Sequence, residues 1–169
     1  MVELRRATGA DAAAIAGVQL RAWRAAYREL LPAWFLDGLR ERSLTAEWAG
    51  NLARAGPEDA VLVAELDGAV VGFAVAGPAR SDDGVGELFE LDVDPAHWGR
   101  GTGRALLAAA TAALAGLGLD EAVLWVLPGN ARARRLYEAA GWVAEGSERD
   151  VQVMGMVVAA QRYRLAALG

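Results

Sequence analysis

The sequence contains no cysteine and no lysine. Without cysteine, the chain can form neither a disulfide nor a thiolate acyl-enzyme. Without lysine, a phosphate-binding loop of the Walker type is excluded, because that loop ends in Gly-Lys-Ser/Thr. All 17 basic residues are therefore arginine. These absences exclude disulfide-stapled folds, cysteine nucleophiles and one large class of nucleotide-binding enzymes.

The sequence also lacks a long apolar run. The stretch 105–119 is apolar but short and rich in Ala and Gly, which predicts a buried helix rather than a membrane span. The first residues lack the apolar centre of a signal peptide. We therefore expect a cytoplasmic protein with no membrane partner.

Charge and spacing exclude two further classes. A net charge of −5 and a pI near 4.9 argue against a nucleic-acid partner, whose phosphates would be repelled. No His, Asp and Cys cluster has the spacing of metal ligands, so we expect no metal. The only histidine, His97, stands beside Trp98 in a turn, where a surface role is the commoner one.

The length of 169 residues and the hydrophobic content of 54% predict a single domain, residues 1–169, with its own core. Apolar periodicity, caps and turn residues predict the element order. The first half is expected to contain a strand at 2–6, a helix that is capped by residues 8–11 and runs to about residue 30, and helices at 33–39 and 43–55. Strands at 61–66 and 69–76, a polar loop at 77–86 and a strand at 87–93 follow. The second half is expected to contain a helix to about residue 118, a strand at 121–127, a helix from Asn130 to Gly141, and strands at 142–149 and 153–165. This order predicts an α/β fold with a mixed, mostly antiparallel central sheet flanked by helices.

The stretch 87–107 carries the strongest functional signal. Proline at position 95 ends the strand, because proline has no N–H for the ladder and restricts the residue before it. Gly99, Gly101 and Gly103 then alternate, which lets backbone N–H groups turn toward one point. The following helix adds unpaired N-terminal donors and a positive dipole end. Together they predict a phosphate or diphosphate site. The stretch does not match a dinucleotide-binding fingerprint, because Leu106 stands where the third glycine of that fingerprint belongs.

A second motif lies downstream, in residues 130–142 (NARARRLYEAAGW). Asn130 is a good helix N-cap, and Gly141 is a good stop. Seven positions bring a helix almost back to its starting direction, so Asn130 and Tyr137 share a face. Arg132, Arg134 and Arg135 form a basic patch near the expected phosphate site, although a solvated helix face explains at least two of them.

The two motifs together, in this order and spacing, resemble the GNAT superfamily of acyl-CoA N-acyltransferases. Segment 98–103 (WGRGTG) is similar to the family turn [Q/R]-x-x-G-x-G/A, and segment 130–142 is similar to N-x-x-A-x-x-L/F-Y-E-x-x-G-F/W. One departure is visible: Trp98 stands where the family most often has Gln or Arg. The departure puts one polar contact to the cofactor phosphates in question, while the backbone donors of the turn remain.

The resemblance implies an enzyme, an N-acetyltransferase that moves acetyl from acetyl-CoA to the primary amine of a small molecule by direct attack in a ternary complex. Two alternatives stay open. One is acetylation of a protein N-terminus or lysine, and the other is a non-catalytic module that senses acyl-CoA. Family habit also favours a homodimer.

The resemblance further implies roles for individual residues. A tyrosine at the position of Tyr137 serves as general acid toward the CoA sulfur. A backbone N–H of the motif strand, here Val93, binds the oxyanion. The acceptor pocket is partly formed by the first helices, where Trp23 and Tyr27 lie four apart on one face. The implied cofactor-binding residues are Leu91, Asp92, Val93, Trp98, Gly99, Arg100, Gly101, Thr102, Gly103, Arg104, Asn130 and Ala133.

For the catalytic base, the first candidate is Glu87. Strand alternation places it on one face with Phe89, Leu91 and Val93, where apolar neighbours would raise its pKa. It stands 14 residues before Gly101, where several GNAT enzymes carry a catalytic glutamate. A purely structural ion pair explains Glu87 equally well. Glu90 and Asp92, expected on the opposite face, are the alternative carboxylates.

Overall fold

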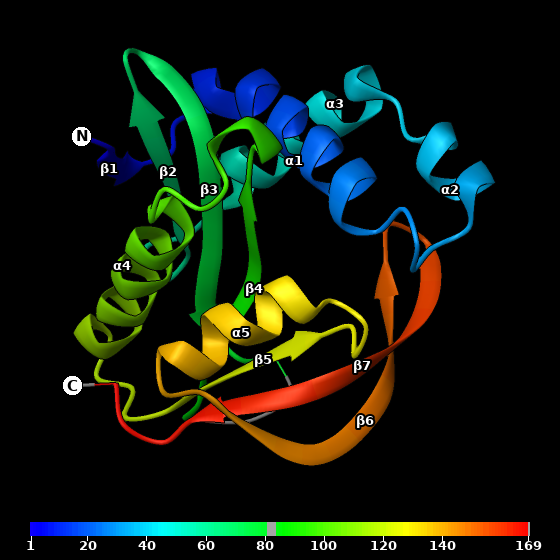
Figure 1. Cartoon of the computed structure of the whole chain (residues 1–169). Coiled ribbons are helices and arrows are strands. Elements are labelled where there is room, and N and C mark those ends of the chain that lie inside the picture. Colours follow the sequence, from blue (N-terminus) through cyan, green and yellow to red (C-terminus); the bar gives the residue numbers. More distant parts are fainter. Residues whose placement is uncertain (81–83, 169) are drawn as a thin grey trace.

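The computed structural model describes residues 1–80 and 84–168. It contains a seven-stranded sheet of order β1-β2-β3-β4-β5-β7-β6, with helices on both faces (Figure 1). Every neighbouring pair is antiparallel except β4 and β5, which run parallel. The expected mixed, mostly antiparallel sheet flanked by helices is confirmed. The expected polar loop 77–86 includes residues 81–83, which lie outside the described residues.

The element bounds agree with the expected order. The strands are β1 (Glu3–Arg6), β2 (Ala60–Leu66), β3 (Ala69–Pro78), β4 (Gly86–Val93), β5 (Ala122–Val126), β6 (Val143–Val153) and β7 (Met156–Leu165). The helices are α1 (Ala12–Ala26), α2 (Ala33–Gly38), α3 (Glu41–Arg54), α4 (Thr102–Gly116) and α5 (Ala131–Ala139), with 3-10 turns η1 (Gly9–Asp11) and η2 (Pro95–His97).

Helix α1 is shorter than its apolar pattern predicts. It ends at Ala26, and Leu30 and Leu31 donate their N–H groups back to the Tyr27 carbonyl. Pro32 keeps α1 from continuing into α2, because proline disfavours helical geometry at the residue before it, here Leu31. The turn lets Leu31 pack with Trp23 in a separate small apolar cluster.

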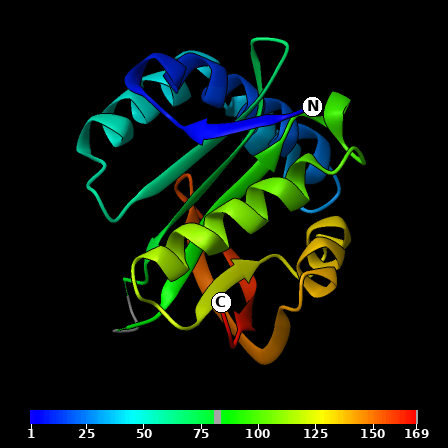
Figure 2. The same cartoon turned by 90° about the vertical axis from the view of Figure 1, so that its left-hand side faces the viewer.

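The two faces of the sheet carry different helices. On one face, Ile15 and Val18 of α1 pack with Trp48 of α3 against Val63 and Phe73 of the sheet. On the other face lie α4, which buries its leucines against β2 to β5, and α5 beside it. Figure 2 shows α4 crossing in front of the strands, with α1 and α3 behind them. Burial of both faces explains why the strands between these layers are so rich in apolar residues.

Strand β4 contains a bulge that changes which side chains share a face. Val75 of β3 pairs with Glu90, and the next residue, Ala76, pairs with Leu88, so Phe89 is an extra residue. A bulge places two residues opposite one and shifts the alternation that follows. The expectation that Glu87 shares a face with Leu91 and Val93 is therefore wrong. Leu91 and Val93 pack on the α4 face.

The register places the acidic residues of β4 together. Glu90 and Asp92 are paired with Val75 and Phe73, whose side chains lie on the α1 face. Glu87, on the other side of the bulge, is paired with Gly77 and falls on this same face. The three acids of β4 thus point to one side of the sheet, whereas simple alternation would separate Glu87 from the other two.

Strands β4 and β5 separate after a short parallel contact. They pair only from Gly86 with Ala122 to Leu88 with Leu124, although β4 continues to Val93. The hairpin of β6 and β7 closes the sheet at the far side, and its tip packs against the segment between α1 and α2 through Val153, Met154 and Met156 (Figure 1). Within the described chain, no helix has the length and apolar character needed to cross a bilayer.

Candidate active site

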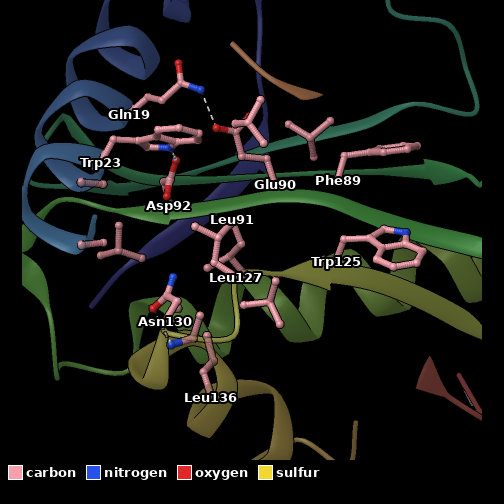
Figure 3. Close-up of a pocket in the computed structure, with 18 of the residues that line it drawn as sticks. Gln19, Trp23, Phe89, Glu90, Leu91, Asp92, Trp125, Leu127, Asn130 and Leu136 are labelled. Carbon is pink, nitrogen blue, oxygen red and sulfur yellow. Dashed lines mark hydrogen bonds between the residues drawn. The ribbon is translucent and has the colours of Figure 1, made fainter. Parts of the chain in front are cut away.

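A cavity of about 1140 Å³ lies where β4 and β5 part. Residues from α1 and α3 line one end, the turn before α4 and the start of α5 line the other, and the hairpin tip contributes a side wall. Figure 3 shows Glu90, Asp92 and Leu91 of β4 between Trp23 above and Asn130 and Leu136 below. The cavity therefore joins the two regions in which the sequence motifs lie.

The glycine turn presents backbone donors at one end of this cavity. Gly99 and Gly101 have φ values of +74° and +85°, in the left-handed region that favours glycine. Gly101 is the N-cap of α4 and has no side-chain cap, and the first helical bond runs from Ala105 N to Gly101 O at 3.0 Å. The N–H groups of the first α4 turn are thus available to an anion.

The second half of β4 has an open backbone edge. Asp94 donates its N–H to the Val71 carbonyl at 2.9 Å, toward β3. Backbone N–H groups alternate in direction along a strand, so Leu91 and Val93 point theirs the other way, where β5 has diverged. This edge offers main-chain groups to an extended ligand and, at Val93, a donor for a developing oxyanion.

Glu90 and Asp92 form a hydrogen-bonded carboxylate pair on the α1 side of the cavity. The Glu90 Oε1 accepts from Gln19 Nε2 at 2.5 Å, and the Asp92 Oδ2 accepts from Trp23 Nε1 at 3.0 Å. Burial raises the pKa of Asp92 to about 6 and, with the charge of Asp92, raises the pKa of Glu90 well above its usual value. Two carboxylates this close repel each other when both are ionised, so the pair loses its two protons in separate steps.

Gln19 is itself fixed by a neighbouring helix. Its Oε1 accepts from Trp48 Nε1 of α3 at 2.8 Å, so its amide N–H₂ must face Glu90. The Trp48–Gln19–Glu90 chain therefore holds one carboxylate oxygen in place. Such a chain leaves the second carboxylate oxygen to face the cavity or Asp92.

Aromatic residues of α1 cover the space between the carboxylates and α5. The rings of Trp23 and Tyr27 pack edge to face, 4.8 Å between centroids. The Tyr27 hydroxyl lies 3.5 Å from Asn130 Nδ2, and Asn130 Oδ1 accepts from Ala133 N at 3.2 Å. Asn130 is thus an N-cap and a contact between α5 and α1 at once.

Tyr137 points into the cavity from α5 and is 7% exposed. Burial, and then the charges of Asp92 and Glu90, raises its pKa above the ordinary value of a tyrosine. Burial raises the pKa of Tyr27 in the same way. Both hydroxyls keep their protons at neutral pH, which a proton donor requires.

Trp98 turns back toward β4. Its Nε1 donates to the Val93 carbonyl at 2.7 Å, and the Arg132 guanidinium lies 4.0 Å from the ring centroid. Arg134, in contrast, donates to Tyr163 Oη and to the Pro128 carbonyl, both at 3.0 Å. Of the expected basic patch, Arg134 is therefore a structural residue, while Arg132 and Arg135 line the cavity.

Most residues singled out from the sequence line this one cavity. They are Trp23, Tyr27, Leu91, Asp92, Val93, Trp98, Gly99, Gly101, Thr102, Gly103, Arg104, Asn130, Ala133 and Tyr137. Arg100 and Glu87 do not line it. Glu87 lies where β4 still pairs with Val123 of β5, and its side chain is 8% exposed. The alternative carboxylates, Glu90 and Asp92, are the ones at the cavity wall.

Sequence reasoning missed Gln19 and Trp48. A signal for Gln19 was present: it lies four residues before Trp23 and eight before Tyr27, so it is a polar residue on the face of α1 that carries these rings. Trp48 carries no such signal. Among residues 1–80 and 84–168, no three His, Asp or Glu side chains gather closely enough to hold a metal ion.

Comparison with known proteins agrees with this architecture. The model of the acetyltransferase (GNAT) family matches residues 20–142. The N-acetyltransferase YuaI of Bacillus subtilis is 33% identical over 133 residues, covering 77% of this chain and 74% of YuaI. The mycothiol acetyltransferase of Thermobispora bispora is 43% identical over 84 residues, but the match covers 47% of this chain and only 28% of that longer protein.

Solved structures share the fold over nearly the whole chain. The PaiA N-acetyltransferase of Thermoplasma acidophilum, in complex with coenzyme A, superposes with a TM-score of 0.76 at 17% identity, covering 97% of this chain and 98% of that one. YncA of Salmonella typhimurium, solved with acetyl-CoA, gives a TM-score of 0.72 at 25% identity, covering 100% and 95%. With its mixed sheet, its glycine turn before α4 and a family match over more than half its length, the chain belongs to the acetyltransferase (GNAT) family.

Proposed function

We propose that this protein transfers an acetyl group from acetyl-CoA to the primary amine of a small molecule by direct attack in a ternary complex. One observation carries the proposal: a single cavity joins the backbone donors of the glycine turn to the Glu90–Asp92 pair along the open edge of β4. The turn suits the CoA diphosphate, and the edge suits the amides of the pantetheine arm. The thioester would then lie between the carboxylate pair and Tyr137.

The carboxylate pair supplies the base. An ammonium must lose a proton before its nitrogen can attack the thioester carbon. Because their pKa values are raised, Glu90 and Asp92 bind a proton more firmly than an exposed carboxylate does, so the pair can take up the proton that the ammonium loses. This assignment replaces Glu87, because Glu87 lies outside the cavity lining. Trp23 and Tyr27 supply ring faces that also favour a cation in this region.

The remaining steps use groups of β4 and α5. As the amine nitrogen bonds to the carbonyl carbon, the carbonyl oxygen becomes an oxyanion, which the Val93 N–H stabilises. The carbon–sulfur bond then breaks, and Tyr137 gives its hydroxyl proton to the leaving thiolate. The ammonium proton stays on the carboxylate pair until it passes to solvent. The second proton of the nitrogen passes to the Tyr137 phenolate as the amide forms, so the products are the amide, the CoA thiol and one released proton.

The contacts around the end of the cavity near Trp23, where the acceptor would bind, favour a small molecule over a peptide. The hairpin tip packs through Val153 and Met154 on the cluster that contains Trp23. On the other side, the Leu30 side chain lies against Gly129, where an added Cβ would be 2.4 Å from it. A polypeptide acceptor requires an open groove, whereas these contacts join the end of α1 to the β6–β7 hairpin and to the loop before α5.

We propose further that the protein works in the cytoplasm as a homodimer. The outermost strand of the sheet, β6, is exposed along most of its length, and Val143 is 66% exposed. Edge strands of this kind can pair with a second copy. Light scattering that gives the mass of one chain would contradict the dimer without affecting the enzymatic proposal.

Calorimetric titration with acetyl-CoA tests the function first. We expect binding that Gly101→Trp abolishes, because an indole at this turn fills the phosphate site. Gly118→Trp is the matched control, since Gly118 also has a positive φ, of +79°, but lies beyond the other end of α4. Thiol release with a panel of small amines then identifies the acceptor.

Three results would contradict the proposal. Absence of acetyl-CoA binding at millimolar ligand would refute the acetyltransferase function itself. Tight binding without thiol release for any amine or peptide would favour the sensor alternative. Release with a peptide N-terminus but with no small amine would favour protein acetylation.

A further inference from the structure

The position of Trp98 raises the question of which side chain binds the cofactor phosphates. A polar residue is usual at this place in the family motif, and an indole has no charge to offer a phosphate. The Trp98 N–H is also already used, because it donates to the Val93 carbonyl at 2.7 Å. The ring is therefore anchored, and its role toward a phosphate must be indirect.

Arg132 lies over that ring. Its guanidinium carbon is 4.0 Å from the ring centroid, a distance typical of a stacked cation–π contact. Within the described part of the chain, Arg132 makes no ion pair with a carboxylate, so its charge is not neutralised by a neighbour. Arg134, two residues on, is bound to Tyr163 and to the Pro128 carbonyl.

The stacked pair borders the phosphate site. Trp98 and Arg132 line the same end of the cavity as Gly101, Thr102 and Gly103. The glycine turn precedes α4, whereas Arg132 belongs to the first turn of α5. Helices α4 and α5 are close here, because a Cβ added at Gly103 would lie 3.4 Å from the Leu136 side chain. A diphosphate on the turn would thus have the guanidinium beside it.

We propose that Arg132 is a side-chain ligand of the CoA diphosphate and that Trp98 positions it. The turn supplies backbone N–H groups, and the guanidinium supplies the charge-assisted hydrogen bonds that the motif position itself lacks. Trp98 restricts the long Arg132 side chain to one orientation before the ligand arrives, which lowers the entropic cost of binding. This inference rests on the proposed use of acetyl-CoA.

Titration of purified variants with CoA tests the inference. Arg132→Gln should weaken binding about tenfold or more, because it removes a charge-assisted contact. Arg132→Lys should recover only part of the loss, since an ammonium lacks the planar fork and stacks poorly. Arg42→Gln, an exposed arginine of α3, controls for the change in net charge and should bind as the wild type does.

A double-mutant cycle tests the role of Trp98. Trp98→Ala should weaken CoA binding severalfold in the presence of Arg132 but have little further effect in Arg132→Gln, because the ring acts through the arginine. If the double variant instead lost CoA affinity by the product of the two single-variant losses, the positioning role of Trp98 would be refuted. Thermal unfolding of each variant checks that the fold is retained.

A ligand series separates the phosphates. The Arg132→Gln penalty should be the same for CoA and for 3′-dephospho-CoA and should vanish for pantetheine, which carries no phosphate. A penalty that disappears with 3′-dephospho-CoA would refute the diphosphate assignment, and wild-type affinity in Arg132→Gln would refute the inference as a whole. Failure of the wild type to bind CoA would instead refute the proposed function.

Discussion

Asp92 and Glu90 determine how the activity should depend on pH. Because the base must be ionised, kcat/KM should fall on the acid side through the raised pKa of the pair, which for Asp92 is about 6. Asp92→Asn removes the negative neighbour of Glu90, so it should move this acid limb to lower pH. Glu90→Gln should lower kcat/KM about 100-fold or more at neutral pH. Measurement of kcat/KM from pH 5 to 9 checks both.

Glu87→Gln is the matched comparison, because Glu87 lies on the same strand and face but outside the cavity lining. It should keep both the rate and the position of the acid limb. A loss confined to Glu87→Gln, with Glu90→Gln unaffected, would return the base to Glu87.

The same pair should make stability depend on pH. Burial raises the pKa of Asp92 above its unfolded value of 3.8, to about 6, so the folded state binds more protons in this window. Stability should therefore fall as pH rises from about 4 to 6 and stay lower above. Asp92→Asn, which can still accept from Trp23, should gain up to about 3 kcal/mol over the wild type at pH 8 and lose this advantage below pH 4. Urea unfolding at both pH values is the measurement, and an equal difference at pH 4 and 8 would contradict it.

The two buried tyrosines make distinct predictions. Tyr137→Phe should lower kcat about 100-fold or more and leave CoA affinity nearly unchanged, because only proton donation to the thiolate is lost. Tyr27→Phe should chiefly change KM for the acceptor, since Tyr27 contacts Trp23 and Asn130. Steady-state kinetics with calorimetry distinguishes them. A large loss of kcat in Tyr27→Phe, with none in Tyr137→Phe, would mean that Tyr27 and not Tyr137 is the proton donor.

At the scale of elements, β4 shows what the sequence predicts well and what it does not. Local signals place the strand, the proline elbow, the glycine turn and the α5 cap, because each rests on residues within a few positions of one another. The bulge at Phe89 carries no such signal, since phenylalanine is a good strand residue and neither glycine nor proline marks the site. Because simple alternation does not account for this extra residue, it wrongly predicts that Glu87 shares a face with Leu91 and Val93.

Hydrogen-bond partners that are distant in sequence could not be predicted from local patterns either. Gln19 and Glu90 stand 71 residues apart in sequence, and Trp48 stands 29 residues from Gln19. Periodicity could identify Gln19 as an inward-facing polar residue of α1, but only the packing of α1 on β4 shows which carboxylate it meets.

A substitution at Gly72 would test how closely β3, β4 and α4 approach one another. A Cβ at this position would lie 3.0 Å from Leu106 Cδ1 and 3.1 Å from the backbone oxygen of Asp92. The side chain can rotate away, but the strand cannot, so Gly72→Ala should cost about 1–3 kcal/mol and displace Asp92. Gly38→Ala is the control, because nothing lies within 4 Å of its added Cβ. Urea denaturation measures both, and equal stability of the two variants would contradict the strand contact.

At the scale of the whole molecule, the two halves of the sheet are joined by a short parallel pairing of β4 with β5, which we call the seam. The half that ends with β4 and the half that begins with β5 share three paired positions in this seam, from Gly86 to Leu88. The predicted single domain thus has its cavity at the place where its two halves are most weakly connected through the backbone.

The parting of β4 from β5 leaves room for the cofactor to act as a temporary strand of the sheet. An extended pantetheine arm carries amides at nearly peptide spacing, so it can pair with the free edge as an added strand does. Deuterium uptake should report this directly: the amides of Leu91 and Val93 should exchange quickly in the free protein and slow down with CoA, whereas Asp94, already bound to Val71, should change little. Unchanged exchange at Leu91 and Val93 on CoA binding would mean that the ligand avoids this edge. If the amides slow as expected, the enzyme completes its own sheet only in the presence of its substrate.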